Sequence, residues 1–138
     1  MEREYWRWPE YRRTIQDVNL TTSSVVTAGV DVGSVSSKAA VLVDGSLYAY
    51  SLMRTTSGSA QSAEKALAWA LEETAMKPDD IKCIASTGYG RINIDFAHKA
   101  ITEISCHARG ANWIWGPSVR TIMDMGGQDC KAIRCDEN

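Results

Sequence analysis

The sequence has neither a long hydrophobic run nor an excess of charge of one sign. Its 138 residues include 15 Lys and Arg against 17 Asp and Glu, so the formal net charge is only -2. Because the charges nearly cancel, the protein has no strong electrostatic field that would attract nucleic acid or an anionic membrane surface. No stretch approaches the roughly 20 apolar residues that span a bilayer, and the first residues lack the apolar core of a secretory signal. We therefore expect a cytoplasmic protein that binds neither nucleic acid nor membrane.

Several familiar site motifs are also missing. Neither G-x-x-x-x-G-K-S/T nor G-x-G-x-x-G occurs, which excludes a P-loop NTPase and a Rossmann dinucleotide domain. The 4 cysteines form no C-x-x-C pair, so we expect reduced thiols and no metal or cluster site. Glu103 and His107 lie on one face of a predicted helix, but no further ligands follow at helical spacing. They indicate a surface or interface pair.

The first 24 residues differ in composition from the rest. Trp6, Trp8 and Tyr11 are interleaved with arginines there, and no helical or alternating period persists. Aromatic residues and Arg are the types that anchor protein interfaces. We expect residues 1–24 to be an N-terminal extension, either a loosely ordered tail or a docking arm, and residues 25–138 to form one domain.

From residue 25 onward, hydrophobic periodicity predicts an α/β domain. The Asp44-Gly45 pair predicts a tight hairpin, and Thr102 is the expected N-cap of the second helix. The expected strands are residues 25–30, 38–43, 46–52, 81–86, 119–125 and 129–135, and the expected helices are residues 59–74 and 102–115. This order predicts a mixed sheet that opens with a three-stranded antiparallel meander and continues through crossover helices. The last residues resemble the start of a hairpin turn, so we expect the domain to be truncated.

Residues 31–38 (Asp-Val-Gly-Ser-Val-Ser-Ser-Lys) form the first candidate phosphate-binding loop. Asp31 ends a predicted buried strand, and ligand sites of open α/β sheets lie at the carboxyl ends of strands. Gly33 permits close approach of a ligand. The expected donors to phosphate oxygens are Ser34, Ser36, Ser37 and Lys38. An ordinary β-turn capped by Asp31 is the alternative interpretation.

Residues 124–128 (Asp-Met-Gly-Gly-Gln) repeat this pattern after a second predicted buried strand. We expect Asp31 and Asp124, at the ends of adjacent strands, to hold Mg²⁺ through water and to position the water that attacks the γ-phosphate of ATP. Phosphoryl transfer requires mainly positioning and charge neutralisation, which two such loops supply. The remaining expected contacts are Gly126 and Gly127 with the terminal phosphate and Gln128 with the attacking water.

Three segments, in the correct order, resemble the motifs of the BadF/BadG/BcrA/BcrD ATPase family. They are residues 30–38, residues 86–91 with 101–111, and residues 123–131. The resemblance implies an actin/hexokinase/Hsp70-like (ribonuclease H-like) ATPase lobe that stops at the start of the second lobe. Within the family, the aromatic N-terminus and residues 107–112 and 126–135 look most like the Q-type ATPase subunit of an ATP-dependent benzoyl-CoA reductase.

The resemblance also implies cofactors and partners. In such a protein, ATP hydrolysis drives low-potential electrons from ferredoxin to ring-reducing subunits, through a [4Fe-4S] cluster shared by two ATPase subunits. The family's cluster cysteines and adenosine motif lie beyond the second phosphate loop, so this segment alone is expected to be inactive. The alternatives are an ATP-dependent activator of a 2-hydroxyacyl-CoA dehydratase, a small-molecule kinase and a non-catalytic nucleotide-binding scaffold.

Overall fold

The computed structural model describes residues 8–18, 20–21 and 24–136. A mixed sheet contains the strands β1 (Tyr11–Thr14), β2 (Val26–Val32), β3 (Ser36–Val43), β4 (Ser46–Arg54), β5 (Cys83–Thr87) and β6 (Lys99–Ala100). The other elements are helices α1 (Ser59–Leu71) and α2 (Glu103–Trp115), strands β7 (Thr121–Met125) and β8 (Cys130–Arg134), and the short 3-10 helices η1 (Pro78–Asp80) and η2 (Arg91–Asn93). The sheet has the strand order β1-β4-β3-β2-β5-β6, whereas β7 and β8 form a separate antiparallel hairpin.

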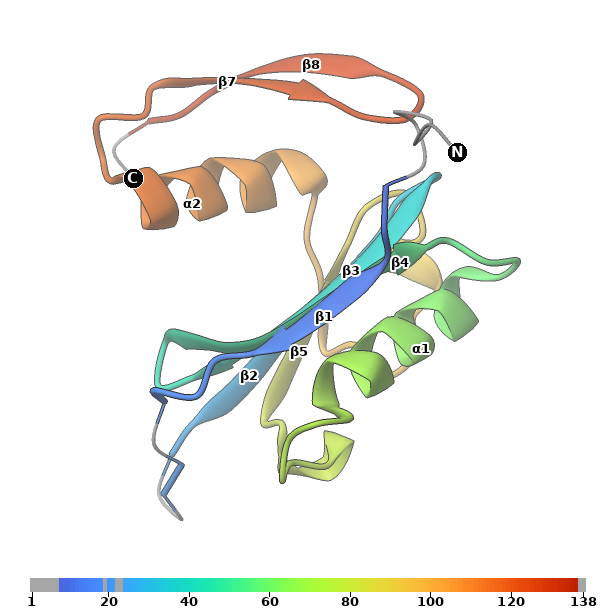
Figure 1. Ribbon diagram of the computed structural model, residues 1–138. Coiled ribbons are helices and arrows are strands. Elements are labelled where there is room, and N and C mark those ends of the chain that lie inside the picture. Colours follow the sequence, from blue (N-terminus) through green and yellow to red (C-terminus); the bar gives the residue numbers. More distant parts are fainter. Residues whose placement is uncertain (1–7, 19, 22–23, 137–138) are drawn as a thin grey trace, which may run out of the picture.

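The layers follow from the alternation of the strands. Alternate residues of β2 and β3 are buried, among them Val30 and Val41, and α1 covers this face of the sheet (Figure 1). The helix turns Ala63, Ala66 and Ala70 inward, and such small side chains let the helix approach the strands closely. Helix α2 lies on the other side, between the sheet and the β7–β8 hairpin (Figure 1).

The predicted meander and its connections are present. Asp44 and Gly45 both have positive φ (50° and 81°) and join β3 to β4 in the tight turn that their sequence predicts. Strand β5 returns parallel to β2 after α1, which makes the sheet mixed. Thr102 caps α2, because its side chain accepts a hydrogen bond from the N–H of Ser105 (3.4 Å). The residues described contain no helix with the length and apolar character needed to cross a bilayer.

One element within residues 1–24 was not predicted. Strand β1 pairs antiparallel with β4 and becomes the edge of the sheet. Its Arg12 forms ion pairs with Glu72 and Glu73 just after α1, which ties the strand to the helix layer. Of the aromatic residues singled out in the sequence, those in residues 1–7 lie outside the described residues.

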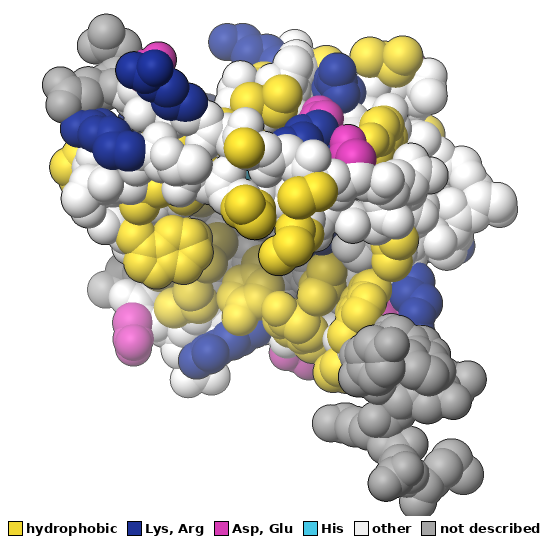
Figure 2. Space-filling view, turned by 90° about the horizontal axis from the view of Figure 1, so that it is seen from above, with side chains coloured by type: hydrophobic (Ala, Val, Ile, Leu, Met, Phe, Trp, Pro, Cys, Tyr) yellow, Lys and Arg dark blue, Asp and Glu magenta, His cyan; other side chains and the backbone are white. Residues whose placement is uncertain are grey.

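The prediction that residues 119–125 form a buried strand beside the strand of Asp31 is wrong. Strand β7 pairs only with β8 among the described strands, and its outward side chains Met123 and Met125 are 70% and 75% exposed. Figure 2 looks down on the hairpin side of the molecule and shows hydrophobic side chains gathered there among charged ones. Alternation predicts a strand correctly but carries no information about which sheet the strand joins.

Candidate phosphate-binding site

The two predicted phosphate loops lie across a cleft of about 290 Å³. One wall is the sheet edge where β2 ends and β3 begins, and the other is the start of α2 with the β7–β8 hairpin. Asp31 and Asp124 both line the cleft, although their strands belong to different sheets. The other lining residues are Gly33, Ser34, Val35, Ser36, Lys38, Gly88, Tyr89, Glu103, His107, Met125, Gly126, Gly127, Asp129 and Lys131.

The first loop is fixed by local hydrogen bonds. The N–H of Gly33 donates to the carbonyl of Ser36 (3.0 Å), which closes the turn between β2 and β3. Lys38 and Asp31 are directly opposed in the β2–β3 ladder, and Lys38 Nζ lies 2.8 Å from Asp31 Oδ2. The lysine thus neutralises the carboxylate while its side chain, 41% exposed, still borders the cleft.

Two predicted site residues do not reach the cleft. Ser37 is fully buried, and its Oγ lies 2.9 Å from Thr55 Oγ1, because β3 alternates and turns residue 37 toward the opposite face from Ser36 and Lys38. The prediction that Ser37 donates to phosphate is therefore wrong. Gln128 lies on the exposed turn of the hairpin and is not among the lining residues.

The second loop touches the first through a glycine. A Cβ added to Gly127 would lie 2.2 Å from Val35 Cγ2 and 3.2 Å from Ser34 Oγ, so a larger residue requires the Val35 side chain or the loops to shift. The N–H of Gly126 donates to the carbonyl of Asp129 (2.9 Å), which closes the hairpin turn. The absence of a side chain at residue 127 therefore sets how closely the two loops approach.

A third loop lies beside Asp31. Gly88, which follows β5, has a φ of +83°, and a Cβ there would lie 2.4 Å from Asp31 Oδ1 and 2.5 Å from the carbonyl oxygen of Val32. This backbone conformation and this contact both require glycine. The loop thereby brings Tyr89 and Arg91, from the predicted motif at 86–91, to the cleft side of the sheet.

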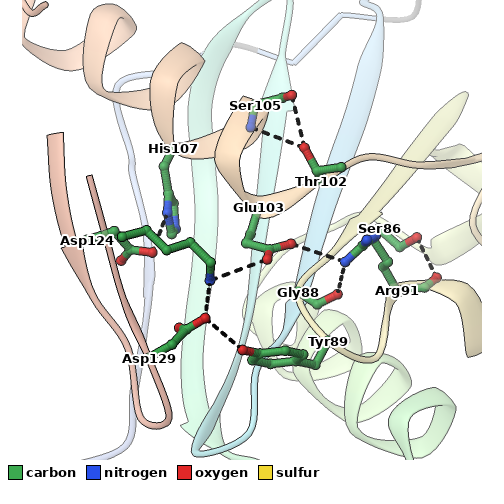
Figure 3. Close-up of polar contacts among 11 residues, drawn as sticks. Ser86, Gly88, Tyr89, Arg91, Thr102, Glu103, Ser105, His107, Asp124 and Asp129 are labelled. Atoms are coloured by element: carbon green, nitrogen blue, oxygen red, sulfur yellow. Dashed lines mark hydrogen bonds and ion pairs between the residues drawn. The ribbon is translucent and has the colours of Figure 1, made fainter. Parts of the chain in front are cut away.

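Polar side chains from three segments meet at the mouth of the cleft (Figure 3). Tyr89 donates to Asp129 Oδ2 (2.9 Å), and Lys131 Nζ lies 2.6 Å from the same oxygen. Glu103 accepts from Arg91 (3.1 Å) and lies 3.5 Å from Lys131. On the next turn of α2, His107 Nδ1 lies 3.1 Å from Asp124 Oδ2, in ion-pair rather than hydrogen-bond geometry.

These contacts shift the proton affinities of the groups. Lys131 and then Tyr89 lower the pKa of Asp129 through hydrogen bonds, and the bond to Asp129 in turn raises the pKa of Lys131. The pKa of Glu103 is lowered mainly by the backbone N–H at the start of α2, with Lys131 and Arg91 adding to it. The shifts therefore favour the charged forms of Asp129, Glu103 and Lys131, while the bond to Asp129 raises the pKa of Tyr89 and keeps its hydroxyl protonated.

Sequence reasoning missed most of this network. The expectation that Glu103 and His107 are a surface or interface pair is wrong, since they line the cleft and contact Lys131 and Asp124. Their four-residue spacing showed a shared helix face, but only the position of the hairpin over α2 shows what that face meets. The sequence did contain a signal for Asp129 and Lys131. They are two residues apart in and just before β8, so their side chains lie on the same face of the hairpin, the face that lines the cleft.

Comparison with known proteins identifies the fold and the family. The sequence model of the BadF/BadG/BcrA/BcrD ATPase family matches residues 28–138. The chain belongs to this family. Its fold is the actin-like ATPase fold, since it superimposes with a TM-score of 0.76 on the crystal structure of the Acidaminococcus fermentans (R)-2-hydroxyglutaryl-CoA dehydratase component A (41% identity, 82% of this chain and 44% of that chain). The predictions of family and fold class are confirmed.

Sequence identity to known proteins differs between dehydratase activators and the benzoyl-CoA reductase subunit. The chain is 47% identical over 112 residues to the activator of lactoyl-CoA dehydratase from Anaerotignum propionicum, a match that covers 80% of this chain and 42% of the activator. It is 31% identical over 117 residues to one subunit of the benzoyl-CoA reductase from Thauera aromatica, covering 81% of this chain and 41% of that subunit. The chain thus spans less than half the length of these relatives, and the identities favour the dehydratase activators over the reductase subunit.

The described residues suit the expected Mg²⁺ but not the expected [4Fe-4S] cluster. Among these residues, no group of three or more His, Cys, Asp or Glu side chains could hold a metal ion directly. Asp31 and Asp124 suit Mg²⁺ held through water and phosphate oxygens, the usual arrangement of Mg²⁺ at nucleotide sites. The cysteines Cys83, Cys106, Cys130 and Cys135 are free thiols, and within the described residues they do not form a cluster site.

Gly88→Ala tests the approach of the third loop to Asp31. Both Gly88 (φ +83°) and Gly116 (φ +87°) occupy backbone conformations that disfavour Ala, but only Gly88 lacks room for a Cβ. We expect Gly88→Ala to lower the free energy of unfolding by about 1–3 kcal/mol more than Gly116→Ala, because overpacking adds to the shared backbone strain. Urea denaturation of the two variants measures this difference, and equal losses would contradict the contact.

Asp129→Asn tests the ion pairs at the cleft mouth through their pH dependence. The folded pKa of Asp129 lies below its ordinary 3.8, so the stabilisation is complete above that value and is lost as the pH falls through the folded pKa. We expect the variant to be less stable than the natural protein at pH 7, and the gap to narrow below about pH 4. Chemical denaturation at both pH values measures the gap, with Asp79→Asn on η1 as the exposed control.

Proposed function

We propose that this chain is the phosphate-binding part of an ATP-dependent activator of a 2-hydroxyacyl-CoA dehydratase. The observation that carries the proposal is the cleft in which Asp31 and Asp124 approach from two sheets with a glycine-bearing loop beside each. The identity of 47% to an activator of lactoyl-CoA dehydratase supports the choice of activator. In this proposal, residues 25–138 comprise the first lobe and the start of the second, and residues 1–24 are an extension ahead of the family match.

The residues of the cleft take distinct roles in ATP hydrolysis. Asp31 and Asp124 would hold Mg²⁺ through water and position the water that attacks the γ-phosphate, and the ion would neutralise charge on the phosphates. Lys38 contributes a cation close to the phosphates. Backbone N–H groups and hydroxyls hold the phosphate oxygens, from Gly33, Ser34 and Ser36 in the first loop and from Gly126 and Gly127 in the second.

The charge of the cleft supports a requirement for a divalent cation. Its lining contains four carboxylates (Asp31, Glu103, Asp124 and Asp129) and two lysines (Lys38 and Lys131), which leaves a negative balance when His107 is neutral. A polyphosphate entering this surface is repelled unless a cation accompanies it.

A related solved structure that contains ADPNP supports a nucleotide as the ligand. It is the activator of 2-hydroxyisocaproyl-CoA dehydratase from Clostridium difficile, with a TM-score of 0.76 at 38% identity over 82% of this chain and 42% of that chain.

The partners in this proposal follow the activators. A second copy of the ATPase shares a [4Fe-4S] cluster with ligands outside the residues described, ferredoxin supplies electrons, and the dehydratase receives them. The second candidate is an ATPase subunit that serves the ring-reducing subunits of a benzoyl-CoA reductase. The 31% identity to a subunit of the Thauera aromatica reductase supports this candidate, together with the shared family motifs.

Asp124→Ala tests the catalytic assignment. We expect ATP hydrolysis in the protein's natural complex to fall about 100-fold or more, because the charge that orients Mg²⁺ and water is lost. Asp79→Ala, which removes an exposed carboxylate from η1, is the matched control and leaves the rate unchanged. Undiminished hydrolysis by Asp124→Ala, measured as phosphate release, would remove the assignment.

Isolation of the natural complex distinguishes the two candidate functions. We expect the protein, affinity-purified under anoxic conditions from its native cells, to activate a co-purified or added 2-hydroxyacyl-CoA dehydratase in the presence of ATP and a low-potential reductant. The measurement is dehydration of a 2-hydroxyacyl-CoA to the enoyl-CoA. Stable association with ring-reducing subunits and ATP-dependent reduction of benzoyl-CoA would instead establish the second candidate.

A further inference from the structure

The position of the second phosphate loop is not set by the main sheet. Strands β7 and β8 pair with each other, and the six-stranded sheet contains neither. The loop between them nevertheless approaches the first loop closely enough that a Cβ at residue 127 would clash with the Val35 side chain. Side chains must therefore hold the hairpin at this distance.

The network at the cleft mouth is a chain of side-chain contacts that the main chain at Gly88 closes into a ring (Figure 3). It runs from Tyr89 through Asp129, Lys131 and Glu103 to Arg91, with contacts of 2.9, 2.6, 3.5 and 3.1 Å. Arg91 closes the ring, because its Nη1 donates to the carbonyl of Gly88 (3.0 Å), next to Tyr89 in the chain. The ring thus joins the loop after β5, the first turn of α2 and the hairpin.

Glu103 is the centre of this ring. Its Oε2 faces Arg91 from the sheet side, and its Oε1 faces Lys131 from the hairpin side. One carboxylate at the start of α2 therefore links the segment after β5 to the hairpin. Its position in the first turn of α2 favours the ionised form, since the helix N-terminus stabilises negative charge.

We propose that the ring of Tyr89, Arg91, Glu103, Asp129 and Lys131 is a latch that sets the separation of the two phosphate loops, with Glu103 as its positioning residue. The proposal rests on the proposed ATPase function. It gives a role to two motifs, residues 86–91 and 101–111, that the direct contacts with phosphate leave unexplained. Gly88 links the latch to chemistry, because it packs against Asp31 and accepts the hydrogen bond from Arg91.

Amide hydrogen exchange in the purified protein without nucleotide tests the latch directly. We expect Glu103→Gln to speed exchange in residues 125–131 about tenfold, because two charge-assisted contacts weaken together. Exchange in β2 and β3 stays unchanged, since their ladder does not involve Glu103. Glu64→Gln, the same substitution on the exposed face of α1, is the control and alters neither region.

Two further variants separate a latch from general destabilisation. Tyr89→Phe removes only a hydroxyl. We expect the double variant Tyr89→Phe/Glu103→Gln to speed hairpin exchange by less than the product of the two single-variant factors, because either change alone opens the same ring. Lys131→Arg keeps the charge and retains both hairpin protection and kcat for ATP hydrolysis, whereas Lys131→Met loses both.

Unchanged exchange of the hairpin in Glu103→Gln, or independent effects of the two single changes, overturns the latch. Such a result alongside normal ATP hydrolysis leaves the proposed function standing. The opposite result, faster hairpin exchange in a protein whose natural form hydrolyses no ATP, supports the latch and removes the function.

Discussion

The cleft depends on two close contacts between loops, and strand pairing fixes only one of them. Gly127 lies against Val35, and Gly88 lies against Asp31, each at a distance that excludes a Cβ. Gly88 follows Thr87, which is paired with Asp31, whereas no ladder among the described strands links Gly127 to Val35. A shift of the hairpin therefore moves the second phosphate loop relative to Asp31, and the geometry of both carboxylates follows from how well these glycines are seated.

Charge pairing follows from the same arrangement. Asp31 faces Lys38, Asp124 faces His107, and Glu103 faces Arg91 and Lys131, so each carboxylate has a basic neighbour already in place. A polyphosphate entering the cleft competes for those neighbours and repels the carboxylates. In the proposed function a divalent cation would resolve the conflict, because it attracts both carboxylates and phosphate oxygens. The negative balance of the cleft thus supports the proposal of a cation-dependent phosphate site more than either loop does alone.

The sequence predicted the parts that depend on local physics. Apolar runs predicted β2 and β3, and alternation predicted β4. The Asp44-Gly45 turn has the positive φ values that its residues favour, and Thr102 caps its helix. It failed where distant segments meet. The period-two geometry of any strand turns Ser37 to the opposite face from Ser36 and Lys38, and the prediction that all three residues bind phosphate did not take this into account. Nothing local in β7, by contrast, shows that it leaves the main sheet and lies over α2.

The two walls of the cleft are held by different kinds of contact, which suits a site that changes shape when its ligand binds. Asp31 lies in a ladder of main-chain hydrogen bonds from Val26 to Val43, so its wall is rigid. Asp124 lies on a hairpin that contacts α2 through the Lys131–Glu103 ion pair and the sheet side through the Tyr89–Asp129 hydrogen bond, and a partly exposed contact of this kind contributes about 0–1 kcal/mol. Opening the ring therefore costs only a few such increments, which differential binding of Mg²⁺ and polyphosphate can offset. A hairpin inserted into the main sheet would lose this property, since moving it would break a strand ladder.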